Sequence, residues 1–242
     1  MKRSRVLLTA LVTVVLLPGL AAGGDYEVVD VESSGRIVGR ISFEGTPPPI
    51  ATLPVTTDNE TCGTEKPSRT LLVGPEGGLK NAVVHLKRVV RGKAWAEREH
   101  VLGQDDCRFE PHILLMNPDA DLLIANSDRI AHNVRSYGRG PVFNVGHPRF
   151  VERLRVENLS AQVSNPDVIR IGCDMHPWMA AYILIQQHPY YALTDAQGRF
   201  ELTDVPPGKY KFEIWHETLG EATLDAAVVA GESTEVAAAL GY

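Results

Sequence analysis

Residues 199–214 read RFELTDVPPGKYKFEI, and this stretch decides the fold class. Apolar side chains alternate with polar ones over 200–202 and again over 210–214, and the sequence Pro-Pro-Gly separates the two runs. A period of two places alternate side chains on one face of a β-strand, and proline and glycine mark turns. The stretch therefore predicts two strands joined by a turn.

The same signals extend outward along most of the chain, whereas helical periodicity is nearly absent. Further alternating runs lie at 37–43, 82–86 and 224–228, and continuous apolar runs lie at 111–116, 122–126, 168–173 and 182–185. Many short strands between turn residues predict an all-β sandwich or barrel. The stretch 137–163 has weak patterning, so we expect mostly loop there, and a short helical turn is conceivable at 94–98.

The N-terminus has the composition of a secretory signal peptide, predicted over 1–22. Three cations lie within the first five residues, an apolar run covers 6–17, and small residues reach Ala22, near which we expect cleavage. No later segment offers the roughly 20 consecutive apolar residues of a membrane span. The sequence thus predicts a periplasmic or secreted protein without a membrane span.

Charge narrows the functional classes further. The chain carries 24 Lys and Arg against 30 Asp and Glu. Removal of the signal takes away three cations and leaves 21 against 30, a net charge of −9. An acidic exported protein is a poor binder of nucleic acid, because the phosphate backbone selects basic surfaces.

The segment Cys173-Asp-Met-His176-Pro-Trp-Met179 offers a thiolate and an imidazole three residues apart after a predicted strand. A third ligand is available from His132, which follows another predicted strand. Two imidazoles and one thiolate, with a weak axial thioether, suit copper in electron transfer. Zinc also accepts one cysteine and two histidines. In the alternative without metal, Cys173 is a core thiol and Met179 a core side chain.

These residues resemble the cupredoxin family in two parts. Phe109-x-Pro111, Asn126-x-Asp128 and His132-Asn-Val134 form the first part, and Cys173-x-x-His176 forms the second. The resemblance covers roughly 106–188. It implies one copper ion held by three equatorial ligands, His132, Cys173 and His176, with Met179 as the axial ligand.

The chain departs from the family at the axial ligand. Two residues separate His176 from Met179, whereas plastocyanin-like members place four there. The shorter spacing is similar to the dinuclear copper loop of cytochrome oxidase subunit II, which also needs a second cysteine that is missing here. Beside the ligands, we expect Asn133 to brace the two ligand loops and Trp178 either to shield His176 or simply to pack.

The C-terminal part resembles the carboxypeptidase regulatory-like family, a prealbumin-type β-sandwich. The resemblance rests on Asp195-Ala-Gln-Gly198, on Pro206-Pro-Gly208 and on an opening strand at 35–43. Because that strand lies far upstream, the resemblance implies that 35–90 and 189–240 form one discontinuous domain. A cupredoxin-like Greek-key domain at 91–188 would then be inserted in it. The whole is similar to exported plastocyanin-like proteins of bacteria, some of which are called methylamine-utilisation proteins.

The remaining cysteines and several histidines have less specific patterns. Cys62 and Cys107 lie in acidic loop sequences, which predicts a surface disulfide. His112 and His216 follow predicted strand positions and are either a second metal patch or hydrogen-bonded side chains. His147 lies in the weakly patterned stretch and could approach the metal.

The motifs leave two main functional hypotheses open. The first is a mononuclear copper protein that transfers single electrons or holds copper, for a redox or copper-delivery partner that the sequence does not identify. The second is a metal-independent sandwich that binds carbohydrate or protein in the cell envelope. We expect no enzyme, because the sequence contains no catalytic motif. A small metalloenzyme would need His147 or His216 at the metal. The oligomeric state and the reduction potential are not predicted.

Overall fold

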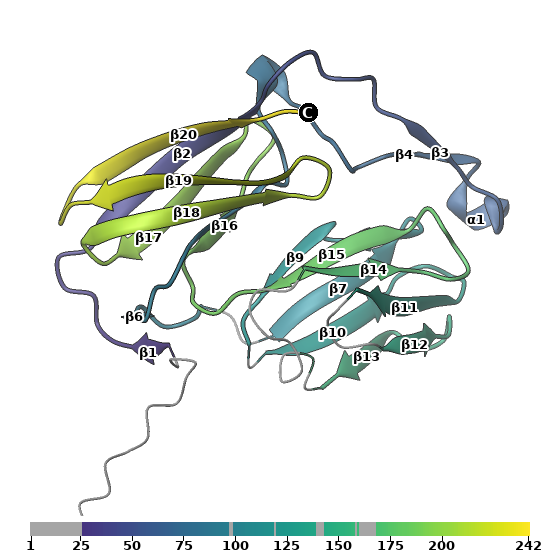
Figure 1. Ribbon diagram of the computed structural model, residues 1–242. Coiled ribbons are helices and arrows are strands. Elements are labelled where there is room, and N and C mark those ends of the chain that lie inside the picture. The colour runs from purple at the N-terminus through teal and green to yellow at the C-terminus, as the bar shows by residue number, and fades with distance from the viewer. Residues whose placement is uncertain (1–25, 97–98, 119, 139–142, 158, 160–167) are drawn as a thin grey trace, which may run out of the picture.

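The computed structural model describes residues 26–242 except 97–98, 119, 139–142, 158 and 160–167, so the predicted signal peptide lies outside the described residues. Almost all regular structure in the described part is β, in several sheets (Figure 1), which confirms the predicted all-β fold class. Among the described residues, no helix is both long enough and apolar enough to cross a membrane.

Two sheets face each other in what we call the central sandwich. The first has the order β12-β11-β14-β15-β9, and the second has the order β13-β10-β7-β8. Their bounds are β7 Glu99–Asp105, β8 Arg108–Glu110, β9 Ile113–Met116, β10 Asp121–Asn126, β11 His132–Tyr137, β12 Asn144–His147, β13 Arg153–Val156, β14 Val168–Gly172 and β15 Ala180–Ile185. Leu102, Phe109 and Ile124 from one sheet and Ile171 and Ile183 from the other fill the core between them.

Two further sheets form the flanking sandwich. Their orders are β16-β5-β18-β19 and β17-β2-β20. The bounds are β2 Gly35–Phe43, β5 Val83–Leu86, β16 Tyr191–Leu193, β17 Arg199–Val205, β18 Gly208–His216, β19 Gly220–Val228 and β20 Ser233–Leu240. The two strands predicted from the runs at 200–202 and 210–214 are both present, as β17 and β18, but they belong to different sheets. β17 pairs with β2, and β18 pairs with β5 and β19.

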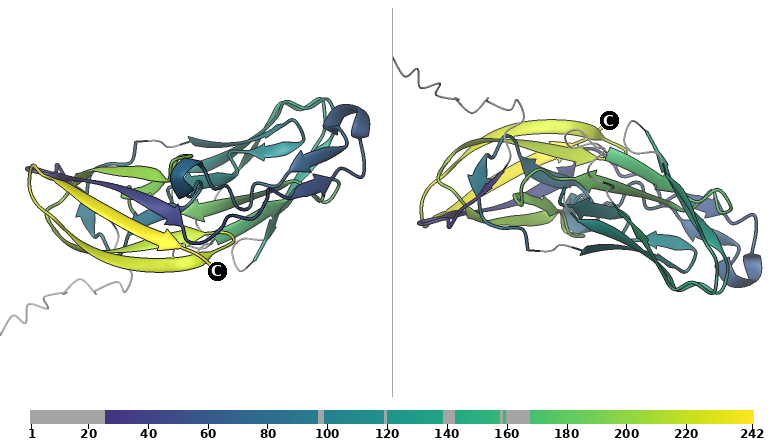
Figure 2. Two further views of the ribbon diagram at one scale, coloured as in Figure 1. Left: turned by 90° about the horizontal axis from the view of Figure 1, so that it is seen from above. Right: turned by 90° about the horizontal axis from the view of Figure 1, so that it is seen from below.

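The two sandwiches lie side by side (Figure 2), and a small apolar cluster joins them. Ile113 and Leu184 from the central sandwich pack there with Val83, and Trp215 packs at its edge. This contact explains why β15 reads as a continuous apolar run: Ile183 points into the central core and Leu184 points into the joining cluster. A strand covered on both faces has no polar side to alternate with.

A segment at residues 52–67 leaves the flanking sandwich and reaches the far end of the central one (Figure 1). We call it the capping segment. It comprises β3 (Thr52–Pro54), α1 (Asn59–Cys62) and β4 (Glu65–Pro67), and β3 pairs with β4. Val55 and Cys62 pack in the central core, although the predicted domain limits placed them with the flanking domain. The predicted division into 35–90 plus 189–240 and 91–188 stays a prediction.

The predicted disulfide is present between Cys62 and Cys107 and ties α1 to the β7–β8 hairpin. Its expected surface position is wrong, because both cysteines are buried in the central core. The acidic residues beside them are exposed: Asp106, for example, pairs with Lys66 at 2.7 Å. The polar sequence therefore reports the outer face of each turn, while the sulfurs occupy the inner one.

Three smaller features complete the fold. β1 (Glu27–Val28) pairs in parallel with β6 (Arg91–Gly92), and η1 (Pro75–Gly77) is a single 3-10 turn. The stretch 137–163, predicted as mostly loop, contains the short strands β12 and β13. Both are half exposed, so their sequences carry few apolar residues. Residues 94–96 are not helical, and the α-helix of the described part is α1.

Candidate metal centre

Three predicted ligands from separate parts of the central sandwich meet at one end of its five-stranded sheet. His132 begins β11, Cys173 follows β14, and His176 lies in the loop before β15. The Nδ1 atoms of the two histidines are 2.9 Å apart, and Cys173 Sγ lies 3.5 Å from His176 Nδ1. One ligand atom from each residue lies within 4.8 Å of the others, and each residue is at most 4 % exposed. Such a group could hold a metal ion.

Asn133 links the two ligand loops, as the sequence predicted. Its backbone N–H donates to Cys173 Sγ at 3.5 Å, and its side-chain Oδ1 accepts the backbone N–H of Asp174 at 2.7 Å. Its Nδ2 donates to Asn144 Oδ1 on β12 at 2.7 Å. These bonds fix the loop after β14 against β11, so the sulfur and the imidazole of His132 keep their relative positions.

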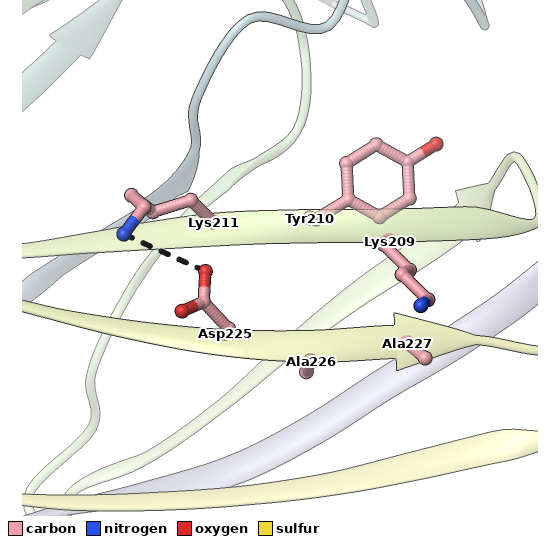
Figure 3. Close-up of a pocket in the computed structure, with 6 residues that line it drawn as sticks. All are labelled: Lys209, Tyr210, Lys211, Asp225, Ala226 and Ala227. Atoms are coloured by element: carbon pink, nitrogen blue, oxygen red, sulfur yellow. Dashed lines mark ion pairs between the residues drawn. The ribbon is translucent and has the colours of Figure 1, made fainter.

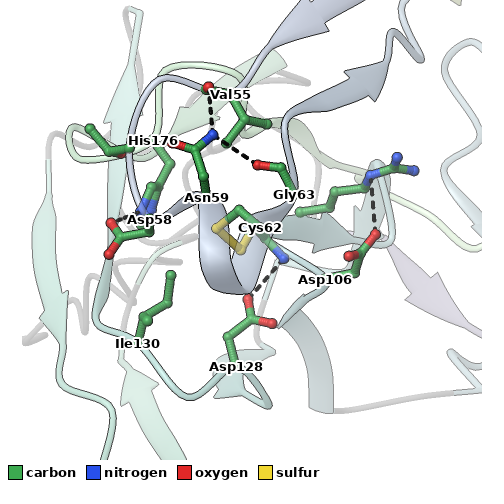
Figure 4. Close-up of a disulfide and its surroundings, with 12 residues drawn as sticks. Val55, Asp58, Asn59, Cys62, Gly63, Asp106, Asp128, Ile130 and His176 are labelled. Atoms are coloured by element: carbon green, nitrogen blue, oxygen red, sulfur yellow. Dashed lines mark hydrogen bonds and ion pairs between the residues drawn. A yellow bond between two sulfur atoms is a disulfide. The ribbon is translucent and has the colours of Figure 1, made fainter.

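A carboxylate holds the outer nitrogen of each histidine. His132 Nε2 lies 2.8 Å from Asp128 Oδ2, and His176 Nε2 lies 3.0 Å from Asp58 Oδ2. Asp58 belongs to the capping segment and lies over His176 beside the disulfide (Figure 4). A proton held between Nε2 and a carboxylate leaves Nδ1 free to bind a cation, and such pairs orient many metal-binding histidines.

The contacts of the cluster shift its ionisation. Burial works against the imidazolium of His132, but the hydrogen bond to Asp128 and the neighbouring Cys173 outweigh it and raise the pKa of His132 to about 9. Burial also works against the Cys173 thiolate, yet His132 and the backbone N–H of Asn133 lower the pKa of that thiol. Both shifts favour the charged forms of the two side chains, and a bound metal ion would take the place of a proton here.

The disulfide is connected to both histidines. The backbone N–H of Cys107 donates to Asp128 Oδ2 at 3.0 Å, and the carbonyl of Cys107 accepts Trp178 Nε1–H at 3.1 Å. The Trp178 ring lies 5.1 Å from the ring of His176, so the residue both shields and packs. Cys107 Sγ also lies close to Asp128 and His132, but it is bonded to Cys62 and offers no thiolate.

Two more side chains of this core have polar or soft atoms. Met179 is buried in the same core as Cys173, and its N–H donates to the carbonyl of His176 at 2.9 Å. Its role as axial ligand stays a prediction. Gln104, on β7 opposite Asn126, is fully buried, and its side-chain amide has no hydrogen-bond partner among the described residues.

The other histidines stand outside both clusters of ligand atoms in the described part of the chain. His147 is the partner of His132 across β11 and β12 and is buried, and burial lowers its pKa. His112 contacts the carbonyl of Ala180 and pairs with Glu217. His216 Nδ1 accepts the N–H of Thr218 at 3.2 Å. His112 and His216 thus follow the hydrogen-bonded interpretation.

Sequence reasoning missed Asp58 as a site residue, although the motif Asn126-x-Asp128 includes the other carboxylate. Asp58 lies 118 positions from His176. It enters the site because α1 is attached to Cys107, and no local pattern indicates this attachment. The signal in the sequence is the pairing of Cys62 with Cys107, because that bond brings the residues just before Cys62 close to those beside Cys107.

Comparison with known proteins yields limited similarity. No family model matches the chain, and no curated protein matches it. A Cu-containing nitrite reductase from Thermus scotoductus SA-01 is 19 % identical, with a TM-score of 0.32, over 41 % of this chain and 25 % of that chain. A purple cupredoxin from Nitrosopumilus maritimus is 17 % identical, with a TM-score of 0.30, over 37 % of this chain and 100 % of that chain.

Proposed function

We propose that this is an exported protein that binds one copper ion through His132, Cys173 and His176, with Met179 as a weak axial donor. The observation that carries the proposal is the meeting of one sulfur and two Nδ1 atoms within 4.8 Å in a buried site. The buried disulfide fits an oxidising compartment, the periplasm or the exterior, to which a signal peptide would direct the chain.

The donor set fits copper better than zinc. Thiolate sulfur stabilises Cu(I) and imidazole suits Cu(II), so one site of this composition serves both oxidation states. Structural zinc usually takes four strong ligands in a tetrahedron. Here the fourth candidate is the thioether of Met179, which is a poor zinc ligand. The carboxylates of Asp58 and Asp128 are already occupied by the outer nitrogens of the two histidines.

The role that this site supports is single-electron transfer, or copper holding, for a partner protein. A bound copper ion would supply the one-electron redox chemistry. The protein supplies a rigid and dry cage: Asn133 fixes Cys173, the two carboxylates orient the imidazoles, and the core excludes water. A cage that moves little between oxidation states keeps the reorganisation energy small. We propose no catalytic residue.

Metal content and the visible spectrum of the mature chain, expressed with its signal peptide into an oxidising compartment, test the proposal. We expect about one copper per chain and a thiolate-to-copper absorption band that Cys173→Ser abolishes. The matched control is Ser233→Ala, an equally small change at an exposed position of β20 in the flanking sandwich, which should keep the band. A protein that takes up no copper, or whose spectrum is unchanged in Cys173→Ser, contradicts the proposal and favours a metal-independent binding module.

A further inference from the structure

The capping segment closes one of the two histidine edges of the site. His176 is fully buried, Asp58 covers its Nε2, and Thr57 Oγ1 donates to the carbonyl of Met175 in the ligand loop at 3.3 Å. The disulfide holds α1 in this position. Electron transfer slows steeply with distance, so a redox partner has to approach the ligands somewhere else or remove this segment first.

The other histidine edge adjoins an open concavity. Asp128, whose Oδ2 holds His132 Nε2, lines a depression of about 650 Å³ between the end of β10 and the turn that joins β12 to β13. The Asp128 side chain is 7 % exposed, so it lies at the base of this depression. One hydrogen bond therefore connects the wall of the depression to a proposed copper ligand.

Arginine side chains surround this depression. Arg129, Arg149 and Arg153 line it, and none of the three side chains has a hydrogen bond or an ion pair with another described residue. Of the two carboxylates in the lining, Asp128 is already paired with His132, which leaves Glu152. The depression is thus locally positive in a chain whose net charge is −6. We call these residues, together with Phe150, the arginine surface.

A second depression shows the difference between a paired and an unpaired basic surface. It measures about 400 Å³ and lies on β18 and β19 of the flanking sandwich, where Lys211 pairs with Asp225 at 3.6 Å (Figure 3). Lys209 and Tyr210 line this depression beside the ion pair. This depression is part of the flanking sandwich. The arginine surface, in contrast, adjoins the metal centre, because Asp128 in its lining is hydrogen-bonded to His132.

Phe150 indicates a protein partner rather than a small anion. Its side chain is 83 % exposed at the tip of the turn that joins β12 to β13, between Arg149 and the strand that carries Arg153. Burial of an exposed aromatic ring contributes to association through lost apolar surface, and aromatic residues and arginine are enriched in protein interfaces. A small oxyanion would use the guanidinium groups and leave the ring in water.

We infer that the arginine surface is the docking site for an acidic surface of the redox or copper-exchange partner, and this inference rests on the proposed copper function. Charge complementarity steers such a partner to the edge of His132, while the rest of this acidic chain repels it. In electron transfer, one electron leaves Cu(I), which becomes Cu(II), and reduces the one-electron acceptor of the partner. The electron would leave the site by way of His132 and Asp128, because the capping segment covers His176.

The first experiment needs no copper and tests the surface alone. Hexacyanochromate(III), a paramagnetic trianion, is added to the isotope-labelled metal-free protein at low ionic strength. We expect it to broaden the amide signals of 126–129 and 149–153 before any others. The charge reversal Arg149→Glu/Arg153→Glu should remove this broadening, whereas the matched reversal Arg91→Glu/Lys209→Glu, at exposed positions of β6 and β18, should leave it.

The second experiment uses the copper-loaded protein. The Cu(I) form is oxidised by hexacyanoferrate(III), an anion, and by tris(phenanthroline)cobalt(III), a cation. In Arg149→Glu/Arg153→Glu we expect the anionic oxidant to react about tenfold more slowly at low ionic strength and the cationic one to react faster, an effect that added salt abolishes. The control pair changes the net charge equally and should change either rate less than twofold.

The outcomes separate the two proposals. Equal effects of both charge reversals would mean that only net charge matters, and broadening elsewhere would move the docking site; either result overturns the arginine surface. Saturation of the surface by inorganic phosphate below millimolar concentration at physiological salt would make it a small-anion site and would overturn the partner. A protein that shows the expected broadening but takes up no copper retains a cationic docking surface for acidic partners and loses the proposed function.

Discussion

His132 in the central sandwich and His188 in the flanking sandwich are both buried, yet their pKa values shift in opposite directions from that of a free histidine. His132 faces the carboxylate of Asp128, and its pKa rises to about 9. His188 donates from Nε2 to the carbonyl of Leu86 at 2.8 Å and accepts the N–H of Tyr190, and burial lowers its pKa to about 4. Because both rings are buried, the comparison teaches that the charge of the hydrogen-bond partner decides whether a core histidine is cationic.

The largest expected effect on stability comes from removal of the disulfide, which lies in the central sandwich. The bridge joins residues 45 positions apart, so the chain-entropy model gives about 4 kcal/mol of stabilisation that Cys62→Ser/Cys107→Ser would remove. Urea unfolding measures this loss, and hydrogen exchange locates it. We expect faster exchange in the capping segment and β7–β8, with β5 and β18 little changed. Equal acceleration in both sandwiches would contradict a local role.

The next effect is acid sensitivity of the flanking sandwich. His188 is neutral when folded, with a pKa of about 4, but binds a proton below about 6.5 when unfolded. Its contribution is therefore complete above pH 6.5 and is lost as the pH falls toward 4, by about 3 kcal/mol in total. The variant His188→Gln should flatten this dependence. Because the pKa of His216 is also lowered to about 4, and burial lowers that of His85 as well, part of the slope should remain. An unchanged slope would contradict the assignment.

The third prediction is a pH dependence of stability with the opposite sign, in the central sandwich of the metal-free protein. The pKa of His132 is raised, so its ionic contribution is present below pH 6.5 and is lost as the pH rises through about 9. Asp128→Asn should lower the pKa of His132 toward its ordinary range, which an NMR titration of the ring measures, and should cost about 1–3 kcal/mol at pH 6.

Asp58→Asn is the matched variant for this third prediction, because it removes the carboxylate of the other histidine. The Asp58 side chain is 48 % exposed, so we expect a cost below about 1 kcal/mol. Equal costs for the two variants would show that the capping segment is as dry as the interior around Asp128, and an unchanged pKa of His132 in Asp128→Asn would contradict the ion pair.

The last prediction concerns Gln104, a neutral polar side chain that is buried in the central sandwich like His132. Its buried amide has no partner among the described residues, and an unpaired buried polar group is costly. Gln104→Leu should therefore stabilise the metal-free protein by about 1 kcal/mol, measured as a rise in melting temperature. A destabilised variant would show that in solution an ordered water or a bound cation satisfies the amide.

Sequence reasoning succeeded where a pattern is local. Alternation and turn residues predicted the long strands, and short motifs predicted that His132, Cys173 and His176 lie close together, as the structure places them. The same reasoning failed for β12 and β13, because short and exposed strands carry little hydrophobic periodicity. The burial of the disulfide also escaped prediction, since the charges that flank the cysteines describe only the outer faces of their turns.

The position of Asp58 could not be predicted for a different reason. Its contact with His176 depends on the path of the capping segment between two sandwiches, and this path is set by tertiary packing of Val55 and Cys62 in the central core. The burial of Gln104 results from inward alternation along β7, with His100 and Leu102 on the same face. That alternation was visible only after the strand had been placed.

The strand pairing of β2 has a consequence for biosynthesis. β2 lies between β17 and β20, which are the last parts of the sheet to leave the ribosome, and it runs parallel to β20. The nascent chain must therefore carry β2 without its neighbours while the entire central sandwich is translated. An unpaired strand is prone to wrong associations. Folding of this protein should consequently benefit from chaperones that shield a strand waiting for its C-terminal partners.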